Sequence, residues 1–202
     1  MTIISNSSTT NHGETFMALC QKADELLMVT PFCYSDFSDF AEALEVAGSI
    51  HRVQFITTLK KDEVVGKIDA LLSFSKEMNR IKVQWELRID NHLHGKIYIF
   101  KKDGDPFAGI ITSANLTHNG MAANHEWGCV IEDEQMLAFI EKQVIDDAPI
   151  QLTESILEEI KERAKMKYPE GVKKEPVATI DIEDILHPFQ ITQDTRIFIK
   201  PV

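Results

Sequence analysis

Cysteine is scarce in this chain of 202 residues. Cys20, Cys33 and Cys129 are odd in number and show no paired spacing, so they do not suggest a disulfide framework. We expect reduced thiols that serve in packing. Internal repeats and low-complexity tracts are also missing, and a composition of 44% hydrophobic and 26% charged residues is that of an ordinary globular protein.

Long apolar runs are missing too. The first residues, Met1 to Asn11, are polar and rich in serine and threonine, unlike the core of a secretion signal. No later segment holds 18 uncharged apolar residues, the length of a membrane-spanning helix. The sequence therefore predicts a soluble, cytoplasmic protein that does not contact a membrane.

An overall excess of positive charge is absent, because the formal net charge is -11. This charge argues against a protein whose whole surface binds nucleic acid, since phosphate binding is largely electrostatic. Between Arg80 and Lys102, however, six basic residues stand against two acidic ones, Glu86 and Asp90. This basic strip is a candidate anion-binding surface, although Lys101 and Lys102 equally fit the lysines that keep strand edges soluble.

Hydrophobic periodicity predicts alternating helices and strands, and therefore an α/β fold. The expected helices cover Glu14–Leu27, Phe37–Ala47, Lys61–Met78, a short segment from Leu116, Glu134–Ile145 and Glu154–Lys167. The expected strands cover Leu27–Cys33, Arg52–Leu59, Ile81–Ile89, His94–Phe100, Phe107–Thr112 and Trp127–Ile131. We expect one main domain over residues 1–150. Residues 151–202 then form an appendage of a helix, a linker and the strand-like Thr195–Ile199, and a further domain could start there.

Polar residues with phosphate chemistry gather in the middle of the chain. His94 and Lys96 flank Gly95 in an expected strand, so their side chains point to the same side of it. Ser113 and Asn115 follow the next strand, which an Asp-Gly-Asp-Pro turn brings alongside the first. Glu126 precedes a third strand, and its carboxylate can accept a hydrogen bond from a histidine ring nitrogen.

Each of these residues has a simpler interpretation when it is taken alone. His94 can be an ordinary strand histidine, and Glu126 a solvated carboxylate at a sheet edge. Ser113 and Asn115 can cap the helix that follows them. The order and spacing of these residues are more informative than any one of them. They occur in three motifs, His94-Gly95-Lys96, Thr112-Ser113-Ala114-Asn115-Leu116-Thr117 and Asn124-His125-Glu126.

This order of motifs resembles the phospholipase D superfamily, and most closely its bacterial nuclease branch, which includes metal-independent restriction endonucleases and helicase-associated nuclease domains. The resemblance covers about residues 23–145, with Val29-Thr30-Pro31-Phe32 similar to the family's first strand and turn. It implies a phospholipase D-like domain with a mixed central sheet and helices on both faces. Many members carry an aspartate five residues after the lysine. Lys101 stands there, which disfavours a lipid-hydrolysing member.

The resemblance also implies roles for the residues and a reaction that needs no metal or other cofactor. His94 would attack phosphorus and form a covalent phosphohistidine. Lys96, Asn115 and Ser113 would hold the non-bridging oxygens, and Glu126 would orient His94. The superfamily uses a second such histidine as the acid, and this chain has one motif. A homodimer with a shared active site would supply that histidine. The expected substrate is nucleic acid, most plausibly DNA, with specificity from a missing C-terminal part, a separate partner protein, or neither.

Three alternatives remain open from the sequence. The same fold could bind nucleic acid or another phosphate ligand without catalysis, or it could hydrolyse phospholipids. A metal site is also conceivable, because His92 and His94 share one face of the expected strand and His125 or Cys129 could join them. No second pair of ligands with tight spacing supports the metal site, and the ammonium of Lys96 would be an unfavourable neighbour for a cation.

Overall fold

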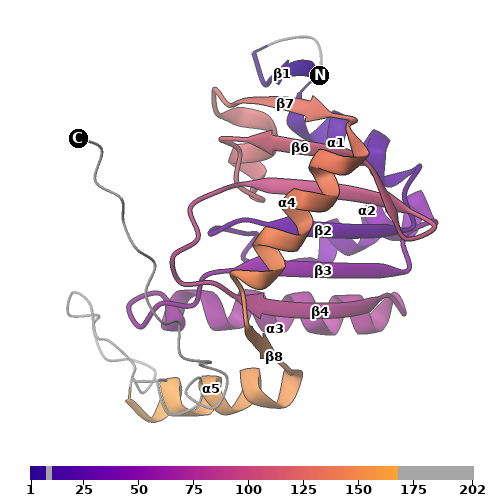
Figure 1. The fold of residues 1–202 in the computed structure, drawn as a ribbon. Coiled ribbons are helices and arrows are strands. Elements are labelled where there is room, and N and C mark those ends of the chain that lie inside the picture. The colour runs from indigo at the N-terminus through magenta and orange to yellow at the C-terminus, as the bar shows by residue number, and fades with distance from the viewer. Residues whose placement is uncertain (8–10, 168–202) are drawn as a thin grey trace.

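A computed structural model describes residues 1–7 and 11–167, which build one sheet of eight strands in the order β1-β7-β6-β5-β2-β3-β4-β8 (Figure 1). β2, β3 and β4 pair in parallel and the other neighbours are antiparallel, so the sheet is mixed as predicted. The strands are β1 (Thr2–Ser5), β2 (Glu25–Val29), β3 (Arg52–Thr57), β4 (Gln84–Ile89), β5 (Ile97–Lys102), β6 (Asp105–Thr112), β7 (Trp127–Ile131) and β8 (Ile150–Leu152).

Helices cover both faces of this sheet, which confirms the predicted layering (Figure 1). One face is crossed diagonally by α4, and α1, α2 and α3 lie behind the other face. The helices are α1 (His12–Cys20), α2 (Ser38–Ala47), α3 (Val64–Arg80), α4 (Glu134–Asp146), α5 (Glu154–Lys167) and the π-helical turn η1 (Asn119–Ala123). No helix among the described residues is long and apolar enough to span a membrane.

Burial on both faces explains why β2 reads as a continuous apolar run rather than an alternating one. Leu26 and Met28 point into the larger core, which is formed with α1, α2 and α3. Leu27 and Val29 point the other way, into the smaller core beneath α4. Central strands buried in this way tolerate little movement, so the loops at their ends have firm anchors.

A two-residue turn joins β5 to β6 and confirms the predicted hairpin. Asp103 and Gly104 both have positive φ, of 54° and 92°, which is the backbone of the turn type that suits the twist of a hairpin. Lys102 pairs with Asp105 beside the turn, and Ile97 pairs with Ile111 at the far end. The start of β5 therefore lies beside the end of β6.

The sheet extends further at both edges than the sequence predicted. β1 pairs with β7 and β8 pairs with β4, and neither strand was expected. α5 follows residue 150, as expected, and its Leu157 and Ile160 are fully buried in the larger core, where α5 packs on α3. The predicted linker and the strand-like Thr195–Ile199 lie outside the described residues.

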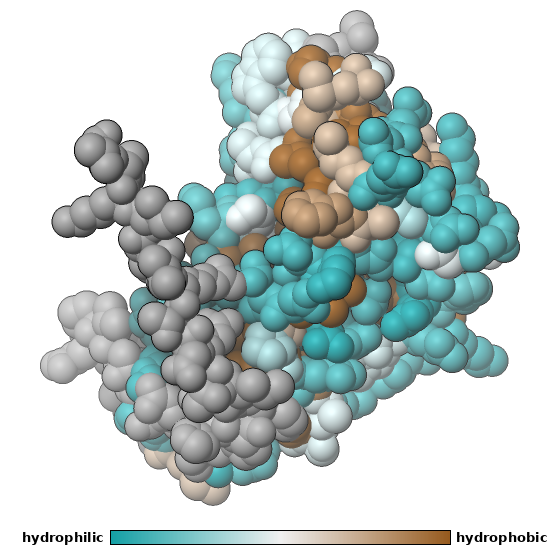
Figure 2. Space-filling model, viewed as in Figure 1, coloured by the Kyte–Doolittle hydropathy of each residue, from teal (hydrophilic) through white to brown (hydrophobic). Residues whose placement is uncertain are grey.

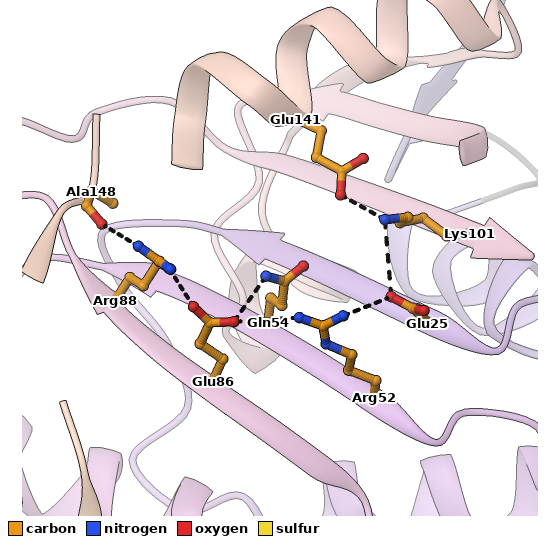
Figure 3. A network of polar contacts seen from close by, with 8 residues as sticks. All are labelled: Glu25, Arg52, Gln54, Glu86, Arg88, Lys101, Glu141 and Ala148. Atoms are coloured by element: carbon orange, nitrogen blue, oxygen red, sulfur yellow. Dashed lines mark hydrogen bonds and ion pairs between the residues drawn. The ribbon is translucent and has the colours of Figure 1, made fainter. Parts of the chain in front are cut away.

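The predicted basic strip is largely neutralised by acidic residues from other elements. Figure 3 shows a row of alternating charges on the face crossed by α4, in which Lys101 contacts Glu141 and Glu25 while Arg88 contacts Glu86. Elsewhere Lys102 pairs with Asp24, and Arg80 pairs with Glu77 and Glu45. Four of the six basic residues are thus paired with carboxylates, and a surface whose charges balance in this way attracts phosphate weakly.

The same face carries hydrophobic side chains above the charged row (Figure 2). The residues that are large, apolar and exposed on its elements are Ile3 on β1, Trp127 on β7, and Met136 and Phe139 on α4. Trp127 is 62% exposed, because α4 crosses the sheet diagonally and leaves the start of β7 uncovered.

Candidate active site

The predicted site residues lie at one edge of the sheet, on three neighbouring loops. Paired positions place the start of β5 beside the end of β6, and the end of β6 beside the start of β7. The loops that carry His94 and Lys96, Ser113 and Asn115, and Glu126 leave the sheet from these three points. Residues more than thirty positions apart in the sequence thus lie at the same end of the sheet.

The prediction that His94 and Lys96 lie within a strand is wrong. β5 begins at Ile97, and both residues belong to the loop before it. On the other side of β5, the chain after β2 reaches Pro31, which has no N–H group to donate to a longer ladder. A last backbone hydrogen bond of 3.1 Å, from Thr112 N to Lys96 O, holds the loop beside β6. Strand alternation therefore does not place these two side chains.

His94 is exposed in this loop, and Lys96 is partly buried. The ammonium of Lys96 donates to the carbonyl oxygen of His94 at 2.9 Å. The imidazole of His94 forms no hydrogen bond with Glu126 in the part of the chain that the structure describes, although such a bond was expected. An exposed imidazole next to an ammonium group suits a nucleophile for an anionic substrate that arrives from solvent.

Ser113 and Glu126 are brought together directly. The Ser113 hydroxyl donates to Glu126 Oε2 and accepts a hydrogen bond of 3.1 Å from the backbone N–H of Trp127. Asn124 Nδ2 donates to the other carboxylate oxygen at 3.4 Å. These contacts fix the carboxylate beside the serine rather than beside the histidine, so the role predicted for Glu126 requires this carboxylate to exchange partners.

Asn115 is oriented by a residue that the motif analysis left without a role. The Thr30 hydroxyl, fully buried at the end of β2, donates to Phe32 O at 2.9 Å and to Asn115 Oδ1 at 3.2 Å. With its oxygen held in this way, Asn115 keeps its amide N–H groups for another acceptor. An amide that presents two N–H groups is a suitable donor for a phosphoryl oxygen.

A buried lysine, also not predicted, supports the turn after β2. The Lys67 ammonium donates to Pro31 O and, at 2.7 Å, to the Thr58 hydroxyl. Burial lowers the pKa of this ammonium group, against the opposing effects of Cys33 and Glu63. Lys67 is thereby committed to the backbone of the turn that carries Thr30. In sequence it is an ordinary helix lysine, so no local pattern reveals this contact.

A second contact that was not predicted reaches the site from the N-terminus. His12 is buried at the start of α1, with Nδ1 2.8 Å from Asn6 Oδ1 and Nε2 2.7 Å from the Thr112 hydroxyl. Asn6 Nδ2 donates to Gly120 O at 2.9 Å and to Asn124 O at 3.0 Å. Burial lowers the pKa of His12, and the negative charge of Glu126 opposes this shift. The contacts span about a hundred residues and leave no local sequence signal.

The alternative metal site is not assembled. No group of three or more histidine, cysteine, aspartate or glutamate side chains within residues 1–7 and 11–167 lies close enough to hold a metal ion. His92 and His125 are exposed, and burial raises the pKa of the Cys33 thiol to about 11.

Comparison with known protein families gives this site its context. Residues 13–159 match the model of the NgoFVII restriction endonuclease N-terminal PLD domain, in which PLD denotes phospholipase D. The chain belongs to this PLD family. The match spans α1 to α5 and includes every predicted site residue, so the family is one of phospholipase D-like nucleases and phosphodiesterases. No curated protein matches the sequence.

Solved structures of PLD proteins resemble the chain in fold. Phosphatidylserine synthase from Haemophilus influenzae Rd KW20 aligns with a TM-score of 0.53 at 16% identity, over 82% of this chain and 45% of that one. Nuc, a phospholipase D family member from Salmonella typhimurium, aligns at 0.48 and 18% identity, over 66% and 84%. NucT from Helicobacter pylori aligns at 0.41 and 15% identity, over 66% and 87%.

Proposed function

We propose that this PLD domain is a metal-independent phosphodiesterase that cleaves DNA through a covalent intermediate on His94, in an active site shared by two copies of the chain. The observation that carries the proposal is the gathering of Lys96, Ser113, Asn115 and Glu126 with His94 on adjacent loops at one sheet edge. The family's restriction endonuclease description favours DNA as the substrate.

The side chains have two roles in this reaction, attack on phosphorus and stabilisation of the negative charge on the phosphoryl oxygens. A ring nitrogen of His94 attacks phosphorus, and the bond from phosphorus to the leaving oxygen breaks. Lys96 and Asn115 donate to the non-bridging oxygens, where negative charge grows in the transition state. Lys96 exchanges its present acceptor, the His94 carbonyl, for a phosphoryl oxygen, which costs little because both partners are accessible to water.

The leaving oxygen needs a proton, and the chain carries one histidine-lysine motif. The partner subunit's His94, when protonated, donates it as the phosphorus–oxygen bond breaks. That imidazole, now neutral, takes a proton from water as the water oxygen attacks phosphorus and breaks the phosphorus–nitrogen bond. One histidine must be neutral while the other is charged, so the two titrate as a coupled pair.

Cleavage of single- and double-stranded DNA in excess EDTA tests the proposal directly. We expect wild type to cleave, His94→Ala to fall to background, and Lys96→Ala to lose roughly 10²- to 10³-fold. His92→Ala is the matched control, because His92 is an exposed histidine in the same loop and has no assigned role. It should cleave as wild type does, and rapid denaturation at alkaline pH, where the phosphorus–nitrogen bond of a phosphohistidine survives, should trap a DNA strand covalently on wild type but not on His94→Ala.

Three results would contradict the proposal. Equal activity of His94→Ala and wild type would remove the nucleophile. Wild type that binds DNA but cleaves neither DNA nor RNA would instead identify a phosphate-binding module on the PLD fold. Loss of activity in EDTA, with restoration by a divalent cation, would contradict the metal-independent chemistry and direct attention to His92 and His125.

A further inference from the structure

His12 lies behind the candidate site, where the N-terminal segment meets the ends of β6 and β7. It is 1% exposed, and both of its ring nitrogens are within hydrogen-bonding distance of side-chain oxygens. The proposed reaction gives it no role. Because a buried imidazole can change its charge near neutral pH, the protonation state that these contacts select matters for the loops around it.

The Asn6 side chain determines which ring nitrogen of His12 carries the proton. Asn6 Nδ2 donates to two carbonyl oxygens, those of Gly120 and Asn124, so its Oδ1 must face His12. That oxygen accepts from His12 N at 3.0 Å and lies 2.8 Å from His12 Nδ1. An acceptor at this distance requires a proton on Nδ1. In the neutral imidazole, Nε2 is therefore unprotonated.

This tautomer determines the direction of the hydrogen bond between His12 and Thr112. The Thr112 Oγ lies 2.7 Å from His12 Nε2 and 3.1 Å from Trp127 O, and it accepts from Ala114 N at 3.0 Å. The hydroxyl has one proton and two possible acceptors. With His12 neutral, the proton points to Nε2. With His12 charged, Nε2 becomes a donor and the hydroxyl proton must turn to Trp127 O.

The backbone groups of Ser113 and Trp127, which adjoin the contacts of Thr112, also hold the side chains of Ser113 and Glu126. Ser113 N donates to Trp127 O at 3.0 Å, Trp127 N donates to Ser113 Oγ at 3.1 Å, and Ser113 Oγ donates to Glu126. Asn6 N contacts Glu126 O at 3.3 Å. The strand ends that carry two predicted site residues are thus connected to His12 on both sides, through Asn6 and through Thr112.

We infer that neutral His12, protonated on Nδ1, is a positioning residue that holds Ser113 and Glu126 in place through Thr112 and Asn6. This inference rests on the proposed function for its catalytic consequence and on the hydrogen-bond geometry for the rest. The charged group that acts on the ring is Glu126, while the side chains within hydrogen-bonding distance of it, those of Asn6 and Thr112, are uncharged, and η1 packs on α1.

Acid disrupts this arrangement in two ways. A proton on Nε2 reverses the hydrogen bond to Thr112, and the new positive charge attracts Glu126 away from the Ser113 hydroxyl. Burial lowers the pKa of His12 below that of the unfolded chain, so the ring is neutral at pH 7. Its contribution to stability is therefore present above about pH 6.5, the unfolded value, and is lost as pH falls through the lower, folded value.

Two substitutions separate the contacts of the ring. His12→Gln places an amide oxygen near the position of Nε2, retains an acceptor for Thr112 and cannot titrate. His12→Asn reaches only the position of Nδ1 and leaves Thr112 without its partner. We expect His12→Asn to lower kcat for DNA cleavage roughly 10- to 10²-fold with KM little changed, because the loss is one of geometry. His12→Gln should retain most of the wild-type kcat at pH 7.5.

The dependence of kcat on pH tests the inference, because a purely structural role of His12 would not change it. The ratio of kcat for wild type to kcat for His12→Gln should be constant above pH 7 and fall as the pH drops through the pKa of His12, which burial holds below its usual value. Protonation steps elsewhere in the site are common to both proteins and cancel in this ratio. A ratio that is flat across the whole range, or equal loss of activity in His12→Gln and His12→Asn, would overturn the inference.

Nitrogen-15 NMR spectra of the His12 imidazole in wild type test its tautomer and its protonation without any cleavage assay. We expect the Nδ1–H tautomer at pH 7.5, and backbone amide shifts of Ser113 and Trp127 that follow the titration of His12. A charged ring, the other tautomer, or amide shifts that ignore the titration would refute the positioning role. A wild type that shows these spectra but cleaves no nucleic acid would refute the proposed function and leave the positioning role intact.

Discussion

Thr30 fixes the amide of Asn115 with a hydroxyl that no solvent reaches. Thr30→Val keeps the shape of the side chain and removes this donor. We expect a loss of about 1 kcal/mol in the free energy of unfolding. Cleavage should fall about tenfold, because the Asn115 amide is free to rotate away from the phosphoryl oxygens. Steady-state cleavage and thermal unfolding measure the two effects.

Thr30→Ser is the control for this substitution, because it keeps the hydroxyl and removes one methyl group. It should cleave nearly as well as wild type even if its melting temperature is lower. Equal losses of activity in the valine and serine variants would show that the packing of the methyl group matters, rather than the hydrogen bond.

At this scale the sequence predicts which residues gather, but not how each is held. The order of His94, Lys96, Ser113, Asn115 and Glu126 along three strand ends was sufficient to place them at one edge of the sheet. Some of the supporting contacts join residues far apart in sequence, 85 residues for Thr30 and Asn115 and 100 residues for His12 and Thr112. Such contacts depend on the register of the whole sheet, which local patterns do not contain.

Among the elements, η1 is pressed against the loop that carries Asn115. A Cβ atom on Gly120 would lie 2.4 Å from Asn115 O and 3.0 Å from Asn115 N, both backbone atoms that cannot rotate away. We expect Gly120→Ala to move η1 or the Asn115 loop, with a cost of about 1–3 kcal/mol in stability and a clear loss of cleavage. Thermal unfolding and the EDTA cleavage assay test both parts.

Gly66→Ala is the matched control, because a Cβ atom there, in the first turn of α3, meets nothing within 4 Å. It should stabilise the protein by about 0.5–1 kcal/mol, since alanine loses less backbone entropy than glycine in a helix. Its cleavage rate should equal that of wild type. A Gly120→Ala variant that behaved in the same way would show that the site tolerates movement of η1.

The reliability of sequence reasoning differs from element to element for physical reasons. α2 and β3 were predicted almost to the residue, because their apolar patterns are strong and complete. β1 has four residues and takes its pairing from β7, so it shows no period of its own. α5 was recognised as a helix, yet its place in the core depends on α3, which its own sequence does not specify.

For the whole molecule, the decisive question is whether two chains share one site. The test is to refold wild-type and His94→Ala chains together in equal amounts, so that dimers form at random. A shared site needs both histidines, so about one quarter of the dimers, and hence about one quarter of the activity, should remain. Independent sites would leave about one half. Sedimentation of an active monomer would contradict the shared site outright.

The pairing of β1 with β7 has a consequence for biosynthesis. Thr2 leaves the ribosome first but finds its ladder partner, Val130, only after almost all of the sheet has been made. Contacts of such large sequence separation form late in folding, since a long loop must close before they contribute. The N-terminal segment that reaches the candidate site thus docks only after β7 has been made. Nascent chains that end before β7 therefore lack the contacts that this segment makes beside the candidate site.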